Sequence, residues 1–113
     1  MFSVIIPTFN NLNYLKLCIK SLIKNSKYKH ELIFHVNEGS DGTLDFVKNQ
    51  KIKHTYTKNN VGLCTAINLA AAEATTKYLL YSHDDMYFCP EWDVSLLNEI
   101  KEIKHDNFFY QEH

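Results

Sequence analysis

The first third of the chain alternates between continuous apolar runs and a helical apolar periodicity. Residues 2–6 are almost entirely apolar and end at Pro7, which is typical of a short strand buried on both faces of a parallel sheet. Apolar residues then recur at steps of three and four over residues 12–23, which predicts an amphipathic helix. The stretch ELIFHV, residues 31–36, predicts a second strand.

The same alternation continues along the rest of the chain. A polar break over residues 37–42 precedes a short helix through Phe46 and Val47, which Ser40 or Asp41 could cap. The remaining predicted segments are a weak third strand at 52–56, a loop at 58–62, an alanine-rich helix face from Leu63 to Ala74, a fourth strand at 77–81, and a helix opened by Pro90 with apolar positions Val94, Leu97, Ile100 and Ile103.

This order of segments predicts an α/β fold, in which helices flank a mostly parallel sheet of about four strands. At 113 residues the chain has the length of one small domain, so we interpret residues 1–113 as a single domain. Ligands of open α/β sheets bind outside the carboxyl ends of the strands. Those ends are polar in this sequence, so we expect a shared binding rim from residues 7–10, 37–40, 57–62 and 83–85.

Composition narrows the classes of function. The formal net charge of −1 gives no reason to expect nucleic acid as a partner. All twelve basic residues are lysine, so the chain has no arginine to bind phosphate through two hydrogen bonds. Three separated cysteines without a CxxC pair predict reduced thiols rather than a structural zinc site. The first residues do not resemble a signal peptide and no segment has membrane-spanning length, so we expect a cytoplasmic protein, with association at the cytoplasmic face of a membrane left open.

The predicted fourth strand ends abruptly in His83-Asp84-Asp85. Two adjacent carboxylates at a strand end can hold a hard divalent cation, because Mg²⁺ takes one or two protein carboxylates and completes its shell with water and substrate phosphates. The alternative is a solvated turn at the end of the strand. His83 could touch such a metal or a diphosphate, or it could be an ordinary strand-end histidine. Fingerprints of dinucleotide-binding folds, P-loop enzymes and serine hydrolases are absent.

Three stretches of the sequence resemble family 2 glycosyltransferases, which have the Rossmann-like GT-A fold. They are SVIIPTFNNLNYLKLCIKSLI at the start, VNEGSDGT after the second predicted strand, and NNVGLCTAINLAAAEATTKYLLYSHDD, which ends in the acidic pair. They occur in the order found in the family and together cover nearly the whole chain. The resemblance implies a nucleotide-diphosphate sugar as donor, with a UDP-sugar favoured, and inverting transfer of a hexosyl group to an acceptor hydroxyl.

The resemblance also implies roles for residues of the rim. Thr8 and Asn10 would line the nucleoside pocket together with backbone groups near Pro7, and Glu38 would accept a hydrogen bond from a ring N–H of the base. The remaining implied assignments are Asn60 and Gly62 near the base and ribose, Asp84 near the ribose or metal, and Asp85 as the carboxylate that binds Mn²⁺ or Mg²⁺ beside the diphosphate, at the close of a DxD-like motif.

The sequence departs from the family pattern in four places. Asn37 and His83 stand where the family usually has acidic residues, and one residue is missing between Ser40 and Asp41. The chain is also much shorter than a family 2 catalytic domain, and we identify no acceptor half and no catalytic base after Trp92. We therefore interpret the chain as a nucleotide-sugar-binding half, truncated before the acceptor half. The alternatives are a non-catalytic nucleotide-binding or interaction module and, less favoured for lack of a glycine-rich basic loop, a nucleotidyltransferase.

Several groups of residues have a structural and a functional interpretation. Glu91 and Asp93 are expected to be helix-end charges favoured by the helix dipole. An apolar sheet edge after the fourth strand could be left uncovered, which suggests a homodimer. Aromatic residues at 78, 81, 87, 88 and 92 could stack on a ligand or pack in the core, and lysines 16, 20, 24, 27 and 29 form either a solvated helix face or a surface attracted to membranes.

Overall fold

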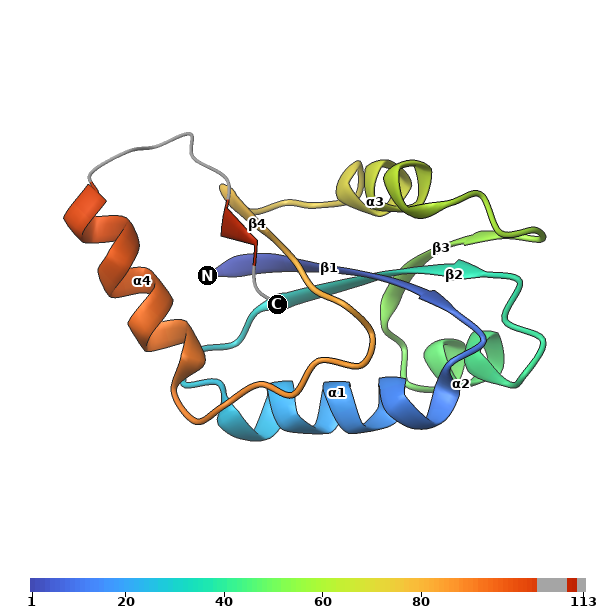
Figure 1. Ribbon diagram of the computed structural model, residues 1–113, viewed down its shortest axis with the longest axis horizontal. Helices are drawn as coiled ribbons and strands as arrows, with labels where there is room; N and C mark the ends of the chain where they lie inside the picture. Colours follow the sequence, from blue (N-terminus) through green and yellow to red (C-terminus); the bar gives the residue numbers. More distant parts are fainter. Residues whose placement is uncertain (104–109, 112–113) are drawn as a thin grey trace.

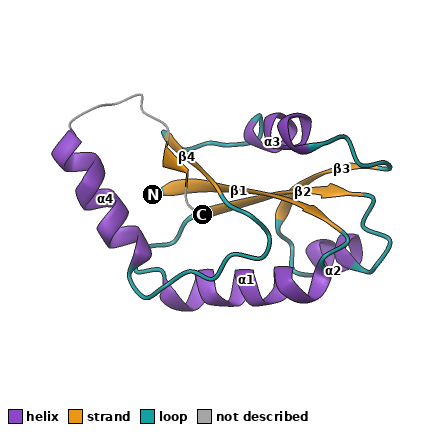
Figure 2. Ribbon diagram, viewed as in Figure 1, coloured by secondary structure: helices purple, strands orange, loops and turns teal. Residues whose placement is uncertain are grey.

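The computed structural model of the protein describes residues 1–103, 110 and 111. Strands and helices alternate along the chain, as the sequence predicts (Figures 1 and 2). In chain order they are β1 (Phe2–Phe9), α1 (Leu12–Asn25), β2 (Glu31–Asn37), α2 (Thr43–Asn49), β3 (Lys53–Thr57), α3 (Leu63–Ala71), β4 (Tyr78–Tyr81), α4 (Trp92–Ile103) and β5 (Tyr110–Gln111).

The strands form one parallel sheet in the order β3-β2-β1-β4-β5. Phe9 of β1 lies opposite Asn37 of β2, which in turn lies opposite Thr57 of β3, so these three strands end at the same level. Strand β4 ends at Tyr81, opposite Ile5, and the chain then continues beside the last part of β1. The polar residues that follow the strands are therefore gathered at one edge of the sheet.

Apolar side chains of β1 alternate between the two faces of the sheet. Phe2, Val4 and Ile6 belong to the larger core cluster with buried residues of α1, α2 and α4, while Ile5 packs in a smaller cluster with Ala70 of α3. Figure 1 shows α1 and α2 on one side of the sheet and α3 on the other. Because both faces are covered, the central strands have the continuous apolar sequence that is typical of parallel sheets.

The C-terminal part differs from the sequence prediction in two ways. The buried face of α4 includes Trp92 and Leu96, whereas Val94, which we expected on that face, is only half-buried. The short strand β5, which no sequence pattern predicted, pairs with β4 at Leu80 and Tyr81. The edge of β4 that we expected to be uncovered is thus paired at these two residues, and the homodimer stays a prediction. Among the described residues, no helix combines the length and hydropathy needed to cross a bilayer.

A single carboxylate links the starts of two helices. Asp41 accepts hydrogen bonds from the backbone N–H of Leu12, the first residue of α1, at 3.1 Å and from that of Thr43, the first residue of α2, at 3.1 Å. Burial raises the pKa of Asp41, but the hydrogen bonds from Thr43 and Leu12 outweigh it and the net pKa is lowered. The residue at the N-cap position of α2 is Gly42, so the predicted N-cap was wrong by one residue, although Asp41 still accepts the first N–H of the helix. Asp41 also fixes the turn after β1 against the loop after β2.

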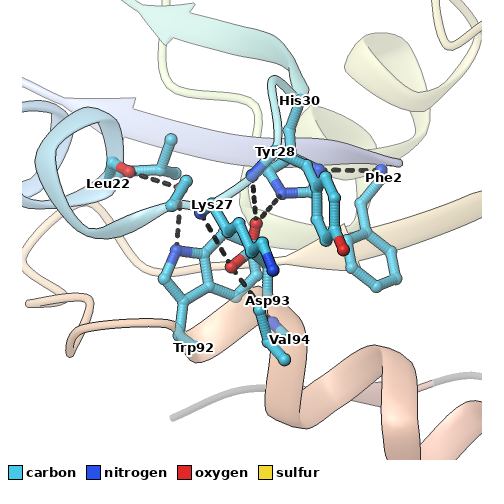
Figure 3. Close-up of polar contacts among 9 residues, drawn as sticks. Phe2, Leu22, Lys27, Tyr28, His30, Trp92, Asp93 and Val94 are labelled. Carbon is cyan, nitrogen blue, oxygen red and sulfur yellow. Dashed lines mark hydrogen bonds and ion pairs between the residues drawn. The ribbon is translucent and has the colours of Figure 1, made fainter.

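A second carboxylate closes the opposite end of the sheet (Figure 3). Asp93 at the start of α4 is fully buried and accepts hydrogen bonds from the backbone N–H of Lys27 at 3.1 Å and of Tyr28 at 2.8 Å. Nε2 of His30 lies 2.8 Å from the same carboxylate. Our prediction that Asp93 is a helix-end charge was incomplete, since its main contacts are with a segment more than sixty residues earlier in the chain.

The hydrogen bonds of His30 determine its protonation. Its Nδ1 accepts a hydrogen bond from the backbone N–H of Phe2 at 3.0 Å, so the ring proton resides on Nε2 and is donated to Asp93. A second ring proton would displace the contact with Phe2, so this site requires a neutral imidazole. Burial accordingly lowers the pKa of His30, although Asp93 opposes the shift. Burial raises the pKa of Asp93, but the hydrogen bonds from Tyr28, Lys27 and His30 outweigh it.

We predict that Asp93→Ala destabilises the protein by roughly 3–5 kcal/mol, because it leaves buried N–H donors without an acceptor. The measurement is urea unfolding followed by the fluorescence of Trp92, the single tryptophan of the chain. The matched control is Asp45→Ala, which removes an exposed carboxylate from the first turn of α2 and should cost less than about 1 kcal/mol. Similar losses in the two variants would contradict the buried role of Asp93.

The lowered pKa of His30 predicts a loss of stability in mild acid. An imidazole whose pKa is lower in the folded state binds more protons when unfolded, so its contribution is complete above about pH 6.5 and declines as the pH falls below it. We expect the free energy of unfolding to decrease between about pH 7.5 and about pH 5.5, and to decrease less in His30→Gln. Burial also lowers the pKa of His35, but this residue contributes equally to the pH dependence of the unaltered protein and of the variant. An unchanged pH dependence in the variant would refute this assignment.

Candidate functional site

A hollow of about 290 Å³ lies at the carboxyl ends of the strands, where the sequence predicts a binding rim. Its walls come from β1 and the turn after it, the end of β2, the start of α3, and the segment after β4. The lining residues are Pro7, Thr8, Phe9, Asn11, Asn37, Gly62, Leu63, Tyr81, His83 and Asp84. Four of the eight predicted site residues, Pro7, Thr8, Gly62 and Asp84, are among them.

Asp84 is held in place by two polar side chains from the first part of the chain. The hydroxyl of Thr8 donates to one carboxylate oxygen at 2.8 Å, and the amide of Asn11 donates to the other at 3.1 Å. Thr8 is buried and Asp84 is half-buried, so water competes poorly for these contacts. The two bonds fix the segment after β4 to the end of β1. They also orient a negatively charged group toward the hollow.

Asp85 is exposed and lies outside the lining of the hollow. Within the described residues, no three His, Cys, Asp or Glu side chains come together as a metal-binding group. A divalent cation here would therefore have few protein ligands. Mg²⁺ commonly takes one or two protein carboxylates and its other ligands from substrate and water.

Asn10 and Glu38 lie beside the hollow in strained backbone. Both have left-handed conformations, with φ of 45° at Asn10 and 63° at Glu38. The amide of Asn10 donates to the hydroxyl of Ser40 at 3.4 Å, and that hydroxyl donates to Glu38 at 3.0 Å. The side-chain oxygen of Asn10 is buried without a hydrogen-bond partner. An unsatisfied buried acceptor next to strained backbone is a feature of ligand sites, because a bound donor group can complete it.

Glu38, for which the family resemblance implied contact with the base, is exposed. Glu38 directly follows Asn37, which lines the hollow. The backbone N–H of Glu38 donates to the carbonyl oxygen of Thr57 at 2.8 Å, so the loop after β3 begins beside it. There, the side-chain oxygen of Asn60 accepts the N–H of Gly62 at 3.0 Å, and Gly62 has φ of 85° where the chain enters α3. Asn60 thus shapes this loop from outside the hollow.

Asn37 has a structural role that the sequence did not predict. Its amide donates to the carbonyl oxygen of Thr8 at 3.4 Å, while its oxygen accepts the N–H of Val61 at 3.0 Å and the hydroxyl of Thr57 at 3.3 Å. An aspartate could accept these bonds but could not donate to Thr8. The amide at this position therefore connects β1, β2 and the loop after β3 without placing a charge in a buried position.

Tyr81 and His83 form the wall next to Asp84. The hydroxyl of Tyr81 lies 3.0 Å from Nδ1 of His83, and the two rings meet edge to face at 5.1 Å. Burial, followed by the charges of Asp84 and Asp85, raises the pKa of Tyr81, so its hydroxyl keeps its proton. Of the other aromatic residues we considered as stacking groups, Phe88 and Trp92 are core residues, while Tyr87 is exposed.

Sequence comparisons agree with this geometry. The family model for glycosyl transferase family 2 matches residues 3–111. An uncharacterized glycosyltransferase of Rickettsia prowazekii (strain Madrid E) is 33% identical over 106 residues, which are 88% of this chain and 33% of that protein. An uncharacterized glycosyltransferase of Rickettsia conorii is 34% identical over 108 residues, which are 88% of this chain and 18% of that protein. The chain thus spans a third or less of the length of these relatives.

Solved structures share the fold. A crystal structure of S. aureus TarS 1-349 aligns with a TM-score of 0.79 and 26% identity, over 89% of this chain and 32% of that chain. The same TarS segment in complex with UDP gives a TM-score of 0.78 at 26% identity. A mannosyltransferase from Pyrobaculum calidifontis, in complex with GDP-Man and Mn²⁺, has the same fold at a TM-score of 0.72 and 22% identity, over 92% of this chain and 32% of that chain.

The neighbours are glycosyltransferases of the GT-A fold, which is the fold that the sequence predicted. The family match covers nearly all of the residues that form the sheet and the hollow at its edge. This chain therefore belongs to glycosyl transferase family 2.

Proposed function

We propose that this chain binds a nucleotide-diphosphate sugar, most favourably a UDP-sugar, at the hollow beside β1 and β4. Together with an acceptor-binding part, it would transfer the hexosyl group with inversion to an acceptor hydroxyl. The observation that carries this proposal is the pair of hydrogen bonds by which Thr8 and Asn11 hold Asp84 at the mouth of the hollow. Open α/β sheets bind ligands at this type of position.

The choice of UDP has support from one comparison. The TarS segment, which is 26% identical to this chain and covers 89% of it, has been solved with UDP. In this chain Pro7, Thr8 and Gly62 line the hollow, where a nucleoside would lie. The unsatisfied oxygen of Asn10 would accept a donor group of the ligand, and the exposed Glu38 would accept a ring N–H of the base.

Asp85 is the residue we propose for holding Mn²⁺ or Mg²⁺. Its carboxylate is exposed, directly follows Asp84, and is of the oxygen type that these cations prefer. When bound, such an ion stabilises the negative charge that develops on a departing diphosphate. The protein itself would hold the nucleoside in the hollow and orient Asp84 through Thr8. With few protein ligands available, we expect metal and nucleotide to bind cooperatively.

A second candidate is a nucleotide-binding or interaction module without catalytic activity. One observation favours it: both oxygens of Asp84 already accept hydrogen bonds from Thr8 and Asn11, which makes Asp84 a poor general base. We assign no catalytic base among the described residues. Donor binding without sugar transfer or hydrolysis, measured against a panel of acceptors, would favour this module, whereas turnover at enzymatic rates would exclude it.

We predict that the chain binds UDP in the presence of Mn²⁺ and that Asp85→Ala weakens this binding about tenfold or more, which corresponds to about 1.4 kcal/mol. Isothermal titration calorimetry with and without Mn²⁺ measures the effect. Asp45→Ala is the matched control, because it removes an exposed carboxylate of α2 outside the lining of the hollow and should bind UDP as the unaltered chain does. Absence of binding by the unaltered chain, or equal binding by the Asp85 variant, would refute the site.

A further inference from the structure

The segment from the end of β1 to the start of β2 carries charge of one sign. Residues 10–30 contain five lysines and no aspartate or glutamate, although the whole chain has a net charge of −1. The segment consists of α1 and the two connections that flank it. We call its exposed side the basic face, formed by Lys16, Lys20, Lys24, Lys27 and Lys29 together with the apolar residues Tyr14, Leu17, Ile23 and Tyr28.

Large apolar side chains are exposed among these lysines. Leu17 is 61% exposed and Ile23 is 67% exposed, whereas Leu15 and Leu22 of the same helix are buried. Tyr14 and Tyr28 extend this apolar surface at its two ends. Packing in the core of the protein therefore does not explain why these side chains are apolar. Figure 1 shows α1 along the outside of the molecule, with its other side against the sheet.

The charges of the basic face are not neutralised within the described part of the chain. The ion pair found there between charged side chains is that of Lys53 with Glu31, and it does not include a lysine of this face. Lys16 lies over the ring of Phe46 at 5.4 Å, which leaves its charge uncompensated. Glu91 lies beside Lys24 and Lys27 at the end of α1, and the buried Asp93 binds the backbone rather than the ammonium group of Lys27.

An apolar hollow of about 460 Å³ continues the basic face beyond the end of α1. Leu22, Ile23 and Leu32 contribute apolar wall, and Lys27, Tyr28 and Lys29 border it. Cationic groups around an apolar recess are suited to a ligand that is anionic at one end and apolar at the other. This apolar hollow lies at the C-terminal end of α1, whereas Asn11, at the N-terminal end of the helix, lines the candidate donor site. The apolar hollow and the donor site can therefore be occupied independently.

We propose that the basic face binds the surface of a bilayer that contains anionic phospholipid. Lysines on an amphipathic helix are attracted by the negative potential of such a surface, and each contributes measurably when several act together. Leu17 and Ile23 would enter the boundary between headgroups and acyl chains, as the apolar residues of interfacial helices do. An acidic protein could pair with the lysines, but it would not account for aliphatic side chains exposed between them.

The proposal is tested by flotation of the unaltered chain with vesicles of phosphatidylcholine alone and of phosphatidylcholine with phosphatidylserine, without nucleotide. We expect binding to the anionic vesicles that weakens as salt is added. Replacing three lysines, as Lys16→Gln, Lys20→Gln and Lys24→Gln together, should reduce the partition coefficient roughly a hundredfold, at about fivefold for each lysine. Circular dichroism checks that each variant is folded.

The matched control is the triple variant Lys58→Gln, Lys77→Gln and Lys101→Gln, which changes the net charge equally at exposed positions that belong neither to α1 nor to the neighbouring α2. It should change the partition coefficient by about twofold or less, because its lysines are not part of the basic face. Equal losses in the two triple variants would overturn the proposal, and so would absence of binding to the anionic vesicles. Retention on polyglutamate without binding to vesicles would also overturn it, in favour of an acidic protein partner.

A double variant, Leu17→Ser and Ile23→Ser, tests the apolar part of the contact. We expect it to lose the binding that remains at high salt, where the attraction of the lysines is screened. Unchanged binding at high salt would overturn the docking of α1 against the acyl boundary. Because no nucleotide is present, these results are independent of whether the donor site binds UDP.

Discussion

The hydrogen bond from Thr8 to Asp84 joins β1 to the segment after β4, 76 residues later in the chain, and the candidate site depends on it. Strand β1 lies between β2 and β4, and the chain passes from β1 to β2 on one side but from β4 to β5 on the other. The direction of the connections therefore reverses between β1 and β4, which leaves a crevice at the carboxyl ends of these strands. Thr8 and Asn11 set the position of the acidic segment across this crevice.

The two ends of the sheet differ in whether their buried polar groups have hydrogen-bond partners. At the amino end, Asp93 accepts three N–H groups from residues 27–30, and His30 in turn accepts the N–H of Phe2. At the carboxyl end, Asn10 has a buried oxygen without a partner, and both Asn10 and Glu38 occupy left-handed backbone. Satisfied polar groups stabilise the fold, whereas unsatisfied ones are retained where a ligand can complete them. This contrast supports the carboxyl end as the binding end.

Much of the fold followed from the periodicity of apolar residues, because covering both faces of a parallel sheet imposes a recognisable pattern. The strand β5 has only two residues, which is too short for any pattern to indicate. Periodicity also could not place Asp93, because its partners depend on how α4 packs beside the connection after α1. Our prediction of the buried face of α4 was partly wrong for the same reason, since Leu96 becomes buried through tertiary packing rather than through helical spacing alone.

The candidate site was predicted in outline rather than in detail. Position after a strand identified Thr8, Gly62 and Asp84, because parallel strands bring their carboxyl ends together. The role of Asn37 could not be inferred in the same way. Its three hydrogen bonds depend on the relative positions of β1, β2 and the loop after β3.

The buried carboxylate of α4 also has a consequence for the order of events as the protein is synthesised. The groups that bind it lie 63 to 66 residues earlier in the chain, and contacts of such high sequence separation form late because a long loop must close first. A nascent polypeptide that stops before residue 93 lacks the acceptor for the backbone N–H groups of Lys27 and Tyr28. These groups therefore stay in water until α4 is made and docks.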